Sequence, residues 1–267
     1  MKRLQCIRSV TIFCLGLLLF LGTRSAFAVD GVIEINQHRA LAGGVTSGDT
    51  PGFPVTLDTE GSYRLTGNLR VDKDTTAILV KADAVTVDLN GFSILGDFKV
   101  GGQGVGILQD SNSGFTEGRL TVRNGTISGV GSHGILGGNS VHVENVQVLG
   151  CGGTGIKTIG VSVIRNNSVA FCQLWGIETL GSVVQNNAVG GNGAQGGAGR
   201  RDPDQVAGGG IHATNGSVVL GNTASANIGP DILMTGDTGY EDNVVSGKSG
   251  IVGGKKLGHN LCGGSYC

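Results

Sequence analysis

A motif that returns every 21 residues constrains the fold of this chain more than any other feature. Gly-Ile pairs occur at Gly134-Ile135, Gly155-Ile156 and Gly176-Ile177. Asparagines recur with the same spacing at Asn124, Asn145 and Asn166, and at Asn186 after 20 residues. A fixed period of this length is typical of a solenoid, in which one short unit stacks on copies of itself.

Each repeat contains three short β-branched segments. In residues 133–153 they are Gly134–Leu136, Val141–Glu144 with alternating apolar and polar residues, and Val146–Val148 after Asn145. Short segments of this kind at regular spacing favour strands. Because strands of successive repeats pair about 4.8 Å apart, we expect an all-β chain: a single-stranded right-handed parallel β-helix with three parallel sheets.

The asparagines also give the size of the solenoid and suggest a polar ladder inside it. Eight of them suggest about eight coils: Asn68, Asn90, Asn124, Asn145, Asn166, Asn186, Asn222 and Asn243. We expect these side chains to point inward and to stack, each amide bonded to the next. Turn propensity alone also explains asparagine at a corner.

The first 28 residues read as a secretory signal peptide. A basic start with Lys2 and Arg3 precedes an apolar run at 10–21 and a small-residue site at Ala26–Ala28. This pattern predicts cleavage, no later membrane insertion, and a secreted or periplasmic protein. The rest, 29–267, is expected to be one domain, with an N-terminal cap at 29–60, coils at 61–247 and a C-terminal cap at 248–267. Residues 33–42 are expected to form a short capping helix that Gly43 and Gly44 end.

Charge after the leader argues against a nucleic-acid partner. The leader takes four of the 19 basic residues and none of the 20 acidic ones, so the remainder carries a net charge of −5. Nucleic-acid binding needs a basic surface.

Four cysteines remain outside the leader, and they fall into two pairs. Cys262 and Cys267 enclose four residues and are expected to form a disulfide that closes the C-terminal cap. Cys151 and Cys172 are 21 residues apart, so they occupy one position on adjacent coils. A disulfide and a stacked pair of buried thiols are both open for this second pair.

Several segments resemble a family of secreted bacterial right-handed parallel β-helix repeat proteins, for which no activity is assigned. The resemblance covers nearly all of the chain after the leader. The segments are 29–37, 51–55, 61–69, 85–92 and 260–264. The wider fold group is similar to pectate lyases, alginate lyases and mannuronan epimerases, and fold likeness alone does not establish their chemistry here.

The resemblance to those lyases places a candidate site on the first strand of the coil. The outward residues after Gly-Ile are Leu136, Lys157, Glu178 and His212. A lyase needs a base and a cation that stabilises the enolate. The catalytic candidates are Lys157, His212 and Arg201, and the substrate-binding candidates are Glu178, Trp175 and Arg200. Asp202 and Asp204 are candidate ligands for Ca²⁺, which takes oxygen donors.

An ordinary structural explanation competes with that site. Lys157 and Glu178 on neighbouring strands match a cross-strand ion pair, and Arg123, Glu144 and Arg165 form the same alternating ladder on another sheet. We therefore expect a non-catalytic binder of an extracellular or envelope polysaccharide or of another surface partner. The alternative is a polysaccharide lyase or C5-epimerase acting on a uronate polymer. The break in the period, 190–209, is where function is expected to lie.

Overall fold

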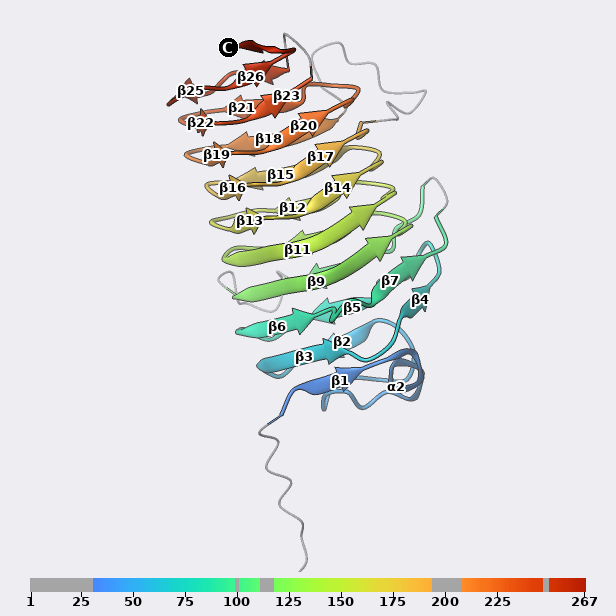
Figure 1. Cartoon of the computed structure of the whole chain (residues 1–267). Coiled ribbons are helices and arrows are strands. Elements are labelled where there is room, and N and C mark those ends of the chain that lie inside the picture. Colours follow the sequence, from blue (N-terminus) through green and yellow to red (C-terminus); the bar gives the residue numbers. More distant parts are fainter. Residues whose placement is uncertain (1–30, 99–100, 111–117, 194–207, 247–249) are drawn as a thin grey trace, which may run out of the picture. The chain divides into compact units, whose positions relative to one another are not determined.

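Short parallel strands stack coil upon coil along the chain (Figure 1). The computed structural model describes residues 31–98, 101–110, 118–193, 208–246 and 250–267. The signal peptide expected at 1–28 therefore lies outside the described residues. Residues Val32–Cys267 form one unit, which contains all of the strands. No helix in these ranges is long and apolar enough to cross a membrane.

One sheet takes a single strand from each coil and has nine strands in the described ranges. All its pairings are parallel. We call it the nine-stranded sheet; its strands are β2 (Val55–Leu57), β5 (Ile78–Val80), β8 (Ile107–Gln109), β10 (Ile135–Gly137), β12 (Ile156–Thr158), β15 (Trp175–Leu180), β18 (Gly209–Thr214), β21 (Ile232–Thr235) and β24 (Ile251–Val252).

The second sheet has eighteen strands in the described ranges and consists of two joined ladders. The first ladder contains β1 (Ile33–Ile35), β3 (Gly61–Leu65), β6 (Val85–Asp88), β13 (Val163–Arg165), β16 (Val183–Gln185), β19 (Val218–Leu220), β22 (Gly239–Glu241) and β25 (Lys255–Lys256). The second ladder contains β4 (Leu69–Val71), β7 (Ser93–Gly96), β14 (Ser168–Ala170), β17 (Ala188–Gly190), β20 (Thr223–Ser225), β23 (Val244–Val245), β26 (Leu261–Cys262) and the antiparallel β27 (Ser265–Tyr266). Both ladders share β9 (Leu120–Ser128) and β11 (Val141–Leu149).

The repeat therefore predicted a parallel-stranded solenoid correctly, and two details differ. Three separate sheets were expected, but β9 and β11 continue through the corner at Asn124 and Asn145 and join two of the ladders. About eight coils were expected, and the nine-stranded sheet shows nine in the described residues. The additional coil begins before residue 61, because β1 pairs with β3 and β2 with β5. At the other end, β24 to β26 continue the ladders beyond 247.

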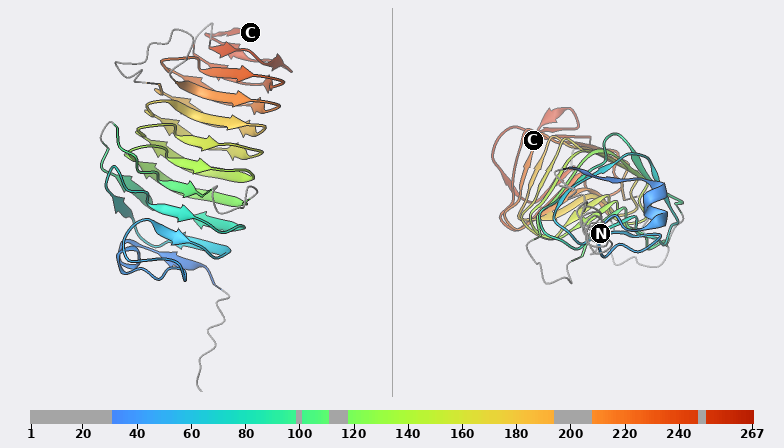
Figure 2. Two further views of the ribbon diagram at one scale, coloured as in Figure 1. Left: turned by 180° about the vertical axis from the view of Figure 1, so that it is seen from behind. Right: turned by 90° about the horizontal axis from the view of Figure 1, so that it is seen from below.

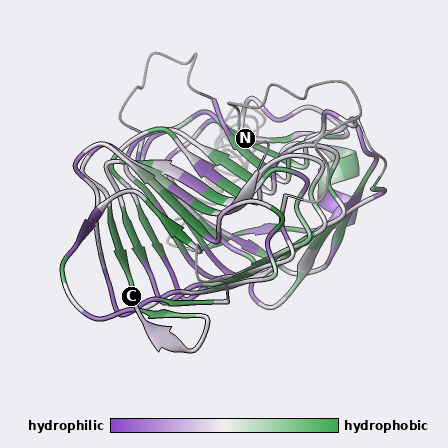
Figure 3. Cartoon of the chain, turned by 90° about the horizontal axis from the view of Figure 1, so that it is seen from above, coloured by the Kyte–Doolittle hydropathy of each residue, from purple (hydrophilic) through white to green (hydrophobic). Residues whose placement is uncertain are grey.

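Apolar ladders fill the inside of the coils (Figure 3). One column of the nine-stranded sheet shows the pattern: each of its side chains is fully buried, and each pairs with the next in register. Its members are Ile78, Ile107, Ile135, Ile156, Ile177, Ile211 and Ile232. Burying one such side chain contributes about 1.5–3 kcal/mol. A single coil cannot bury these side chains alone, so this stabilisation depends on the neighbouring coils.

The expected inward asparagine ladder is confirmed at Asn222 and Asn243, but on the two coils before them it lies one residue beyond the expected position. Asn124, Asn145, Asn166 and Asn186 have φ between 54° and 60° and turn the corner. Their side chains are exposed or half-buried. The inward ladder is formed by the next residue of each coil, whose side chain is buried: Asn167, Asn187, Asn222, Asn243 and Asn260.

Each rung of this buried ladder is bonded to the next. The Nδ2–Oδ1 distances are 3.0 Å from Asn167 to Asn187, 3.0 Å from Asn187 to Asn222, and 3.1 Å for each of the next two rungs. Each Oδ1 also accepts the backbone N–H of the coil before it, as Asn187 does from Asn167 at 3.0 Å. The ladder thereby satisfies backbone groups that the corner leaves without strand partners.

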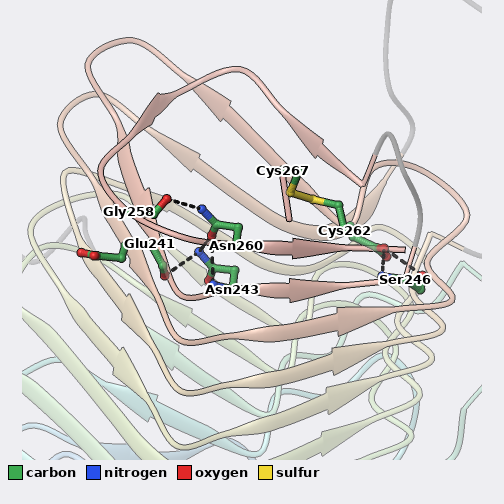
Figure 4. The surroundings of a disulfide bond; sticks show 8 residues. Glu241, Asn243, Ser246, Gly258, Asn260, Cys262 and Cys267 are labelled. Atoms are coloured by element: carbon green, nitrogen blue, oxygen red, sulfur yellow. Dashed lines mark hydrogen bonds between the residues drawn. A yellow bond between two sulfur atoms is a disulfide. The ribbon is translucent and has the colours of Figure 1, made fainter. Parts of the chain in front are cut away.

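At the two ends of the described unit the regular coils give way to a short helix and to an antiparallel strand pair (Figure 2). The expected helix at 33–42 is only α2 (Gln37–Ala42), because Ile33–Ile35 pairs as β1. Asn36 caps α2 by accepting the Arg39 N–H at 3.0 Å, and Gly43 at φ 73° ends it as expected. At the C-terminal end the expected disulfide between Cys262 and Cys267 is present, with Cα atoms 5.7 Å apart (Figure 4).

The second cysteine pair is not a disulfide in this structure. Cys151 and Cys172 are free and buried, so the alternative of stacked thiols holds. The neighbouring thiol of Cys172 and burial both raise the pKa of Cys151. On the next coil, Asn192 takes the place of a third cysteine. The backbone N–H of Cys172 donates to Asn192 Oδ1 at 3.0 Å.

Candidate functional site

The outward face of the nine-stranded sheet carries one continuous column of side chains. The register aligns Leu136 with Lys157, Lys157 with Glu178, Glu178 with His212, and His212 with Leu233. This confirms the stacking predicted from the repeat, including its continuation across the break in the period at 190–209. Below Leu136 the column continues with the apolar Leu108 and Leu79 and ends at the buried Thr56.

Lys157 and Glu178 form an ion pair, as the structural explanation predicted. Lys157 Nζ lies 3.0 Å from Glu178 Oε1, and Thr154 Oγ1 donates to Glu178 Oε2 at 3.3 Å. Both charged side chains are half-buried.

His212, the second catalytic candidate on this column, is partly enclosed. Its ring centroid lies 4.9 Å from that of Trp175, with the ring planes at 32°. Its Nδ1 is buried and has no hydrogen-bond partner among the described residues. Burial lowers the pKa of His212, and the nearby Glu178 opposes this effect. The imidazole is therefore neutral at neutral pH.

Trp175, a substrate-binding candidate from the sequence, does not present its ring to solvent. The side chain is only 7% exposed and packs on His212. A Cβ at Gly209 would lie 2.5 Å from Trp175 Cζ3, so the ring lies across the start of β18. Glycine at 209 leaves room for the indole. The ring thus orients His212 and gives a ligand no open stacking surface.

His133 belongs to the same cluster, although the sequence reasoning did not identify it. Its Nδ1 accepts the backbone N–H of Thr154 at 3.0 Å, so the neutral ring carries its proton on Nε2. Burial, and then the charge of Lys157, lower the pKa of His133. The period contained a signal for this residue, because His133, Thr154 and Trp175 are each 21 residues apart.

We call His133, Thr154, Lys157, Trp175, Glu178 and His212 the polar cluster. It combines a compensated ion pair with two neutral imidazoles. Four predicted partners lie outside the described residues: Arg200, Arg201, Asp202 and Asp204. The approach of Arg201 to Lys157 therefore stays a prediction. Within the described ranges, no group of three or more His, Cys, Asp or Glu is placed to hold a metal ion. Calcium binding stays a prediction.

A shallow cleft opens on the N-terminal part of the same sheet, and no sequence pattern indicated it. Its volume is 340 Å³. It is lined by Leu79 and Leu108 of the outward column together with Phe53, Pro54, Asp74, Thr75 and Thr76. The cleft and the polar cluster are therefore joined by the apolar part of the column, through Leu136.

The first ladder carries the second charge ladder predicted from the sequence. Arg165 Nη2 lies 2.7 Å from Glu144 Oε2, and Arg123 Nε lies 3.0 Å from Asp88 Oδ2. The imidazole of His142 lies beside the first of these pairs, with its Nε2 3.6 Å from Glu144 Oε2. They support register and solubility.

We expect the two lowered histidine pKa values to make stability depend on pH. The folded state keeps His133 and His212 neutral, whereas the unfolded chain protonates them near pH 6.5. Stability is therefore full above pH 6.5 and falls as the pH drops through 6.5 toward the folded pKa. Melting temperatures should fall between pH 7.5 and 5.5, and they should fall less in a His133→Gln/His212→Gln variant. Equal pH slopes in the two proteins would contradict this assignment.

Comparison of the chain with protein-family models, with curated proteins and with solved structures found no match.

Proposed function

We propose that this chain is an exported, non-catalytic β-helix protein that binds a polysaccharide along the outer face of its nine-stranded sheet. Parallel strands joined by crossovers are right-handed in about 98% of cases, which supports the right-handed form. The leader composition supports cleavage and export to the periplasm or the medium.

The observation that carries the proposal is the polar cluster on an otherwise apolar column. Lys157 and Glu178 are half-buried and offer a hydrogen-bond donor and an acceptor on adjacent rungs of the stacking axis, while the buried Thr154 holds the Glu178 carboxylate. The spacing of adjacent rungs is about 4.8 Å. A linear polymer that lies along this axis meets a regular series of polar groups and, toward the cleft, apolar ones. Such a mixture is typical of a binding surface.

Charge favours an uncharged glycan over a uronate polymer. The positive charge of Lys157 is compensated by Glu178 at 3.0 Å, and both histidines of the cluster are neutral. The chain after the leader carries a net charge of −5. An acidic polymer would therefore meet no net positive charge among the described residues of the cluster.

One observation favours the enzymatic alternative enough to keep it in the test. His212 is neutral and has an unpartnered Nδ1 among the described residues, which is the state of a general base. A polysaccharide lyase or C5-epimerase would use it on a uronate, with a cation from outside the described residues.

The test combines binding with turnover. The mature protein is titrated calorimetrically with hydroxyethylcellulose, galactan, polygalacturonate and alginate, with and without Ca²⁺. Unsaturated product is followed by ultraviolet absorbance and epimerised uronate by NMR. We expect a neutral polymer to bind more tightly than either uronate polymer, without turnover. Turnover that His212→Ala or Lys157→Ala abolishes would establish the enzyme instead.

Two matched variants test the location of binding. Lys157→Met breaks the ion pair of the polar cluster, and we expect it to weaken binding about tenfold. Arg165→Met breaks the corresponding pair with Glu144 on the first ladder, and we expect no change. Equal effects of the two variants would show that the nine-stranded sheet is not the binding face.

A further inference from the structure

Phe171 occupies a position that favours glycine. It lies at the corner between β14 and β15 with φ 59°. The equivalent corners of neighbouring coils have φ 70° at Gly129, 62° at Gly150, 66° at Gly191 and 56° at Ala226. A bulky residue in this left-handed region is a genuine outlier, because its Cβ crowds the backbone.

Core packing does not account for this residue. The Phe171 side chain is 65% exposed, so little of the ring is buried in the solenoid. What holds it is the next corner: a Cβ at Gly191 would lie 2.8 Å from Phe171 Cε1 and 2.9 Å from Cδ1. The ring thus rests over the bare backbone of Gly191, and much of it faces solvent.

Small and polar residues lie beside the ring on the second ladder. Ala170 and Gly190 are the outward neighbours on β14 and β17, and they leave the approach open. Ser168 on β14 and Ser225 on β20 are exposed and offer hydroxyl groups. An aromatic face beside hydroxyl donors and acceptors is suited to the apolar face of a sugar ring whose own hydroxyls need partners.

The exposed apolar area that the described residues form at this corner is small for a protein partner. Among the described residues of this corner, the other exposed large apolar side chains are Leu174 and Ile228. A specific protein interface buries about 800 Å² on each partner, whereas one aromatic side chain offers about 150–250 Å². A single pyranose ring matches this platform.

We infer that Phe171 is a stacking platform for one sugar residue of the bound polysaccharide. This inference rests on the proposed function and adds a contact that the polar cluster does not contain. Phe171 lies four residues before Trp175, at the corner that leads into the nine-stranded sheet. A polymer that also contacts the platform would extend from the sheet face onto this corner.

The decisive variant is Phe171→Gly, because the two explanations of the ring predict opposite results. If the ring serves binding, glycine relieves the left-handed backbone and raises the melting temperature by roughly 2–4 °C. It then weakens binding about tenfold. If the ring serves packing, the variant melts lower and binds as the wild type does.

Binding is measured by affinity electrophoresis in gels that contain hydroxyethylcellulose, galactan, polygalacturonate or alginate. Phe171→Trp is the matched control and should keep the retardation. Its fluorescence should also change on binding, since the only other tryptophan, Trp175, is buried.

Unchanged retardation of Phe171→Gly would overturn the platform and leave the proposed function standing. A wild type that no polymer retards would overturn both. Loss in Phe171→Gly with no loss in Lys157→Met would keep the platform and reject the polar cluster.

Discussion

Replacing Asn187 by alanine is expected to destabilise the protein by about 3–5 kcal/mol. Its Nδ2 donates to Ile164 O at 2.9 Å and to Asn222 Oδ1 at 3.0 Å, and its Oδ1 accepts two bonds from Asn167. The side chain is 2% exposed, so water cannot replace these bonds. Removing it leaves two buried backbone groups of the preceding coil, Ile164 O and Asn167 N–H, without these partners and breaks the amide ladder to both neighbouring coils.

The neighbouring asparagine provides the control. Asn186 turns the corner at φ 55° with an exposed side chain, and glycine adopts that conformation freely. Asn186→Gly is expected to change stability by less than about 0.5 kcal/mol. Urea unfolding followed by circular dichroism compares the two variants. Equal losses would mean that the ladder of buried amides does not hold the coils together.

Replacing Gly152 by alanine is the second change with a large expected effect. A Cβ at this position would overlap the carbonyl oxygen of Gly131 on the coil below, which is backbone and cannot turn away. Gly131 is itself pressed against Lys73 O and Gly102. The coils would have to separate locally, so we expect a loss of about 3 kcal/mol.

Gly138→Ala is the matched control for this change. The nearest atom to a Cβ there is Gln109 Oε1 at 3.6 Å, which is ordinary contact. Its φ is not in the left-handed region. We expect this variant to be neutral or slightly stabilised, because alanine restricts the unfolded chain. Thermal melts of the two single variants make the comparison, and a neutral Gly152→Ala would show that adjacent coils can separate at little cost.

The repeat made register predictable because it is a property of spacing alone. Side chains one period apart must share a column, so the alignment of Lys157 with Glu178 follows from 21 residues. The Gly-Ile motif also predicts the alignment of Glu178 with His212, although 34 residues separate the two Gly-Ile pairs there. The capping disulfide was equally accessible, since Cys262 and Cys267 are close in sequence.

The spacing could not show which side chains point into the solenoid or how deeply each is buried. In Asn166-Asn167 and Asn186-Asn187 both residues repeat, and only backbone geometry decides which turns the corner and which is buried. Likewise Trp175 reads as a candidate platform, while its burial depends on the room that Gly209 leaves. Phe171 looks unremarkable in the sequence, because its significance lies in a φ of 59°.

The histidine NMR spectrum provides the most direct test of where a polysaccharide binds. The chain has five histidines, and only His133 and His212 belong to the polar cluster; His38, His142 and His259 lie elsewhere and act as internal controls. The ring C–H signals are recorded while hydroxyethylcellulose or galactan is added to residues 29–267 of the chain. We predict that the signals of His133 and His212 shift or broaden and that the other three do not. Changes confined to His38, His142 or His259 would contradict binding at the nine-stranded sheet.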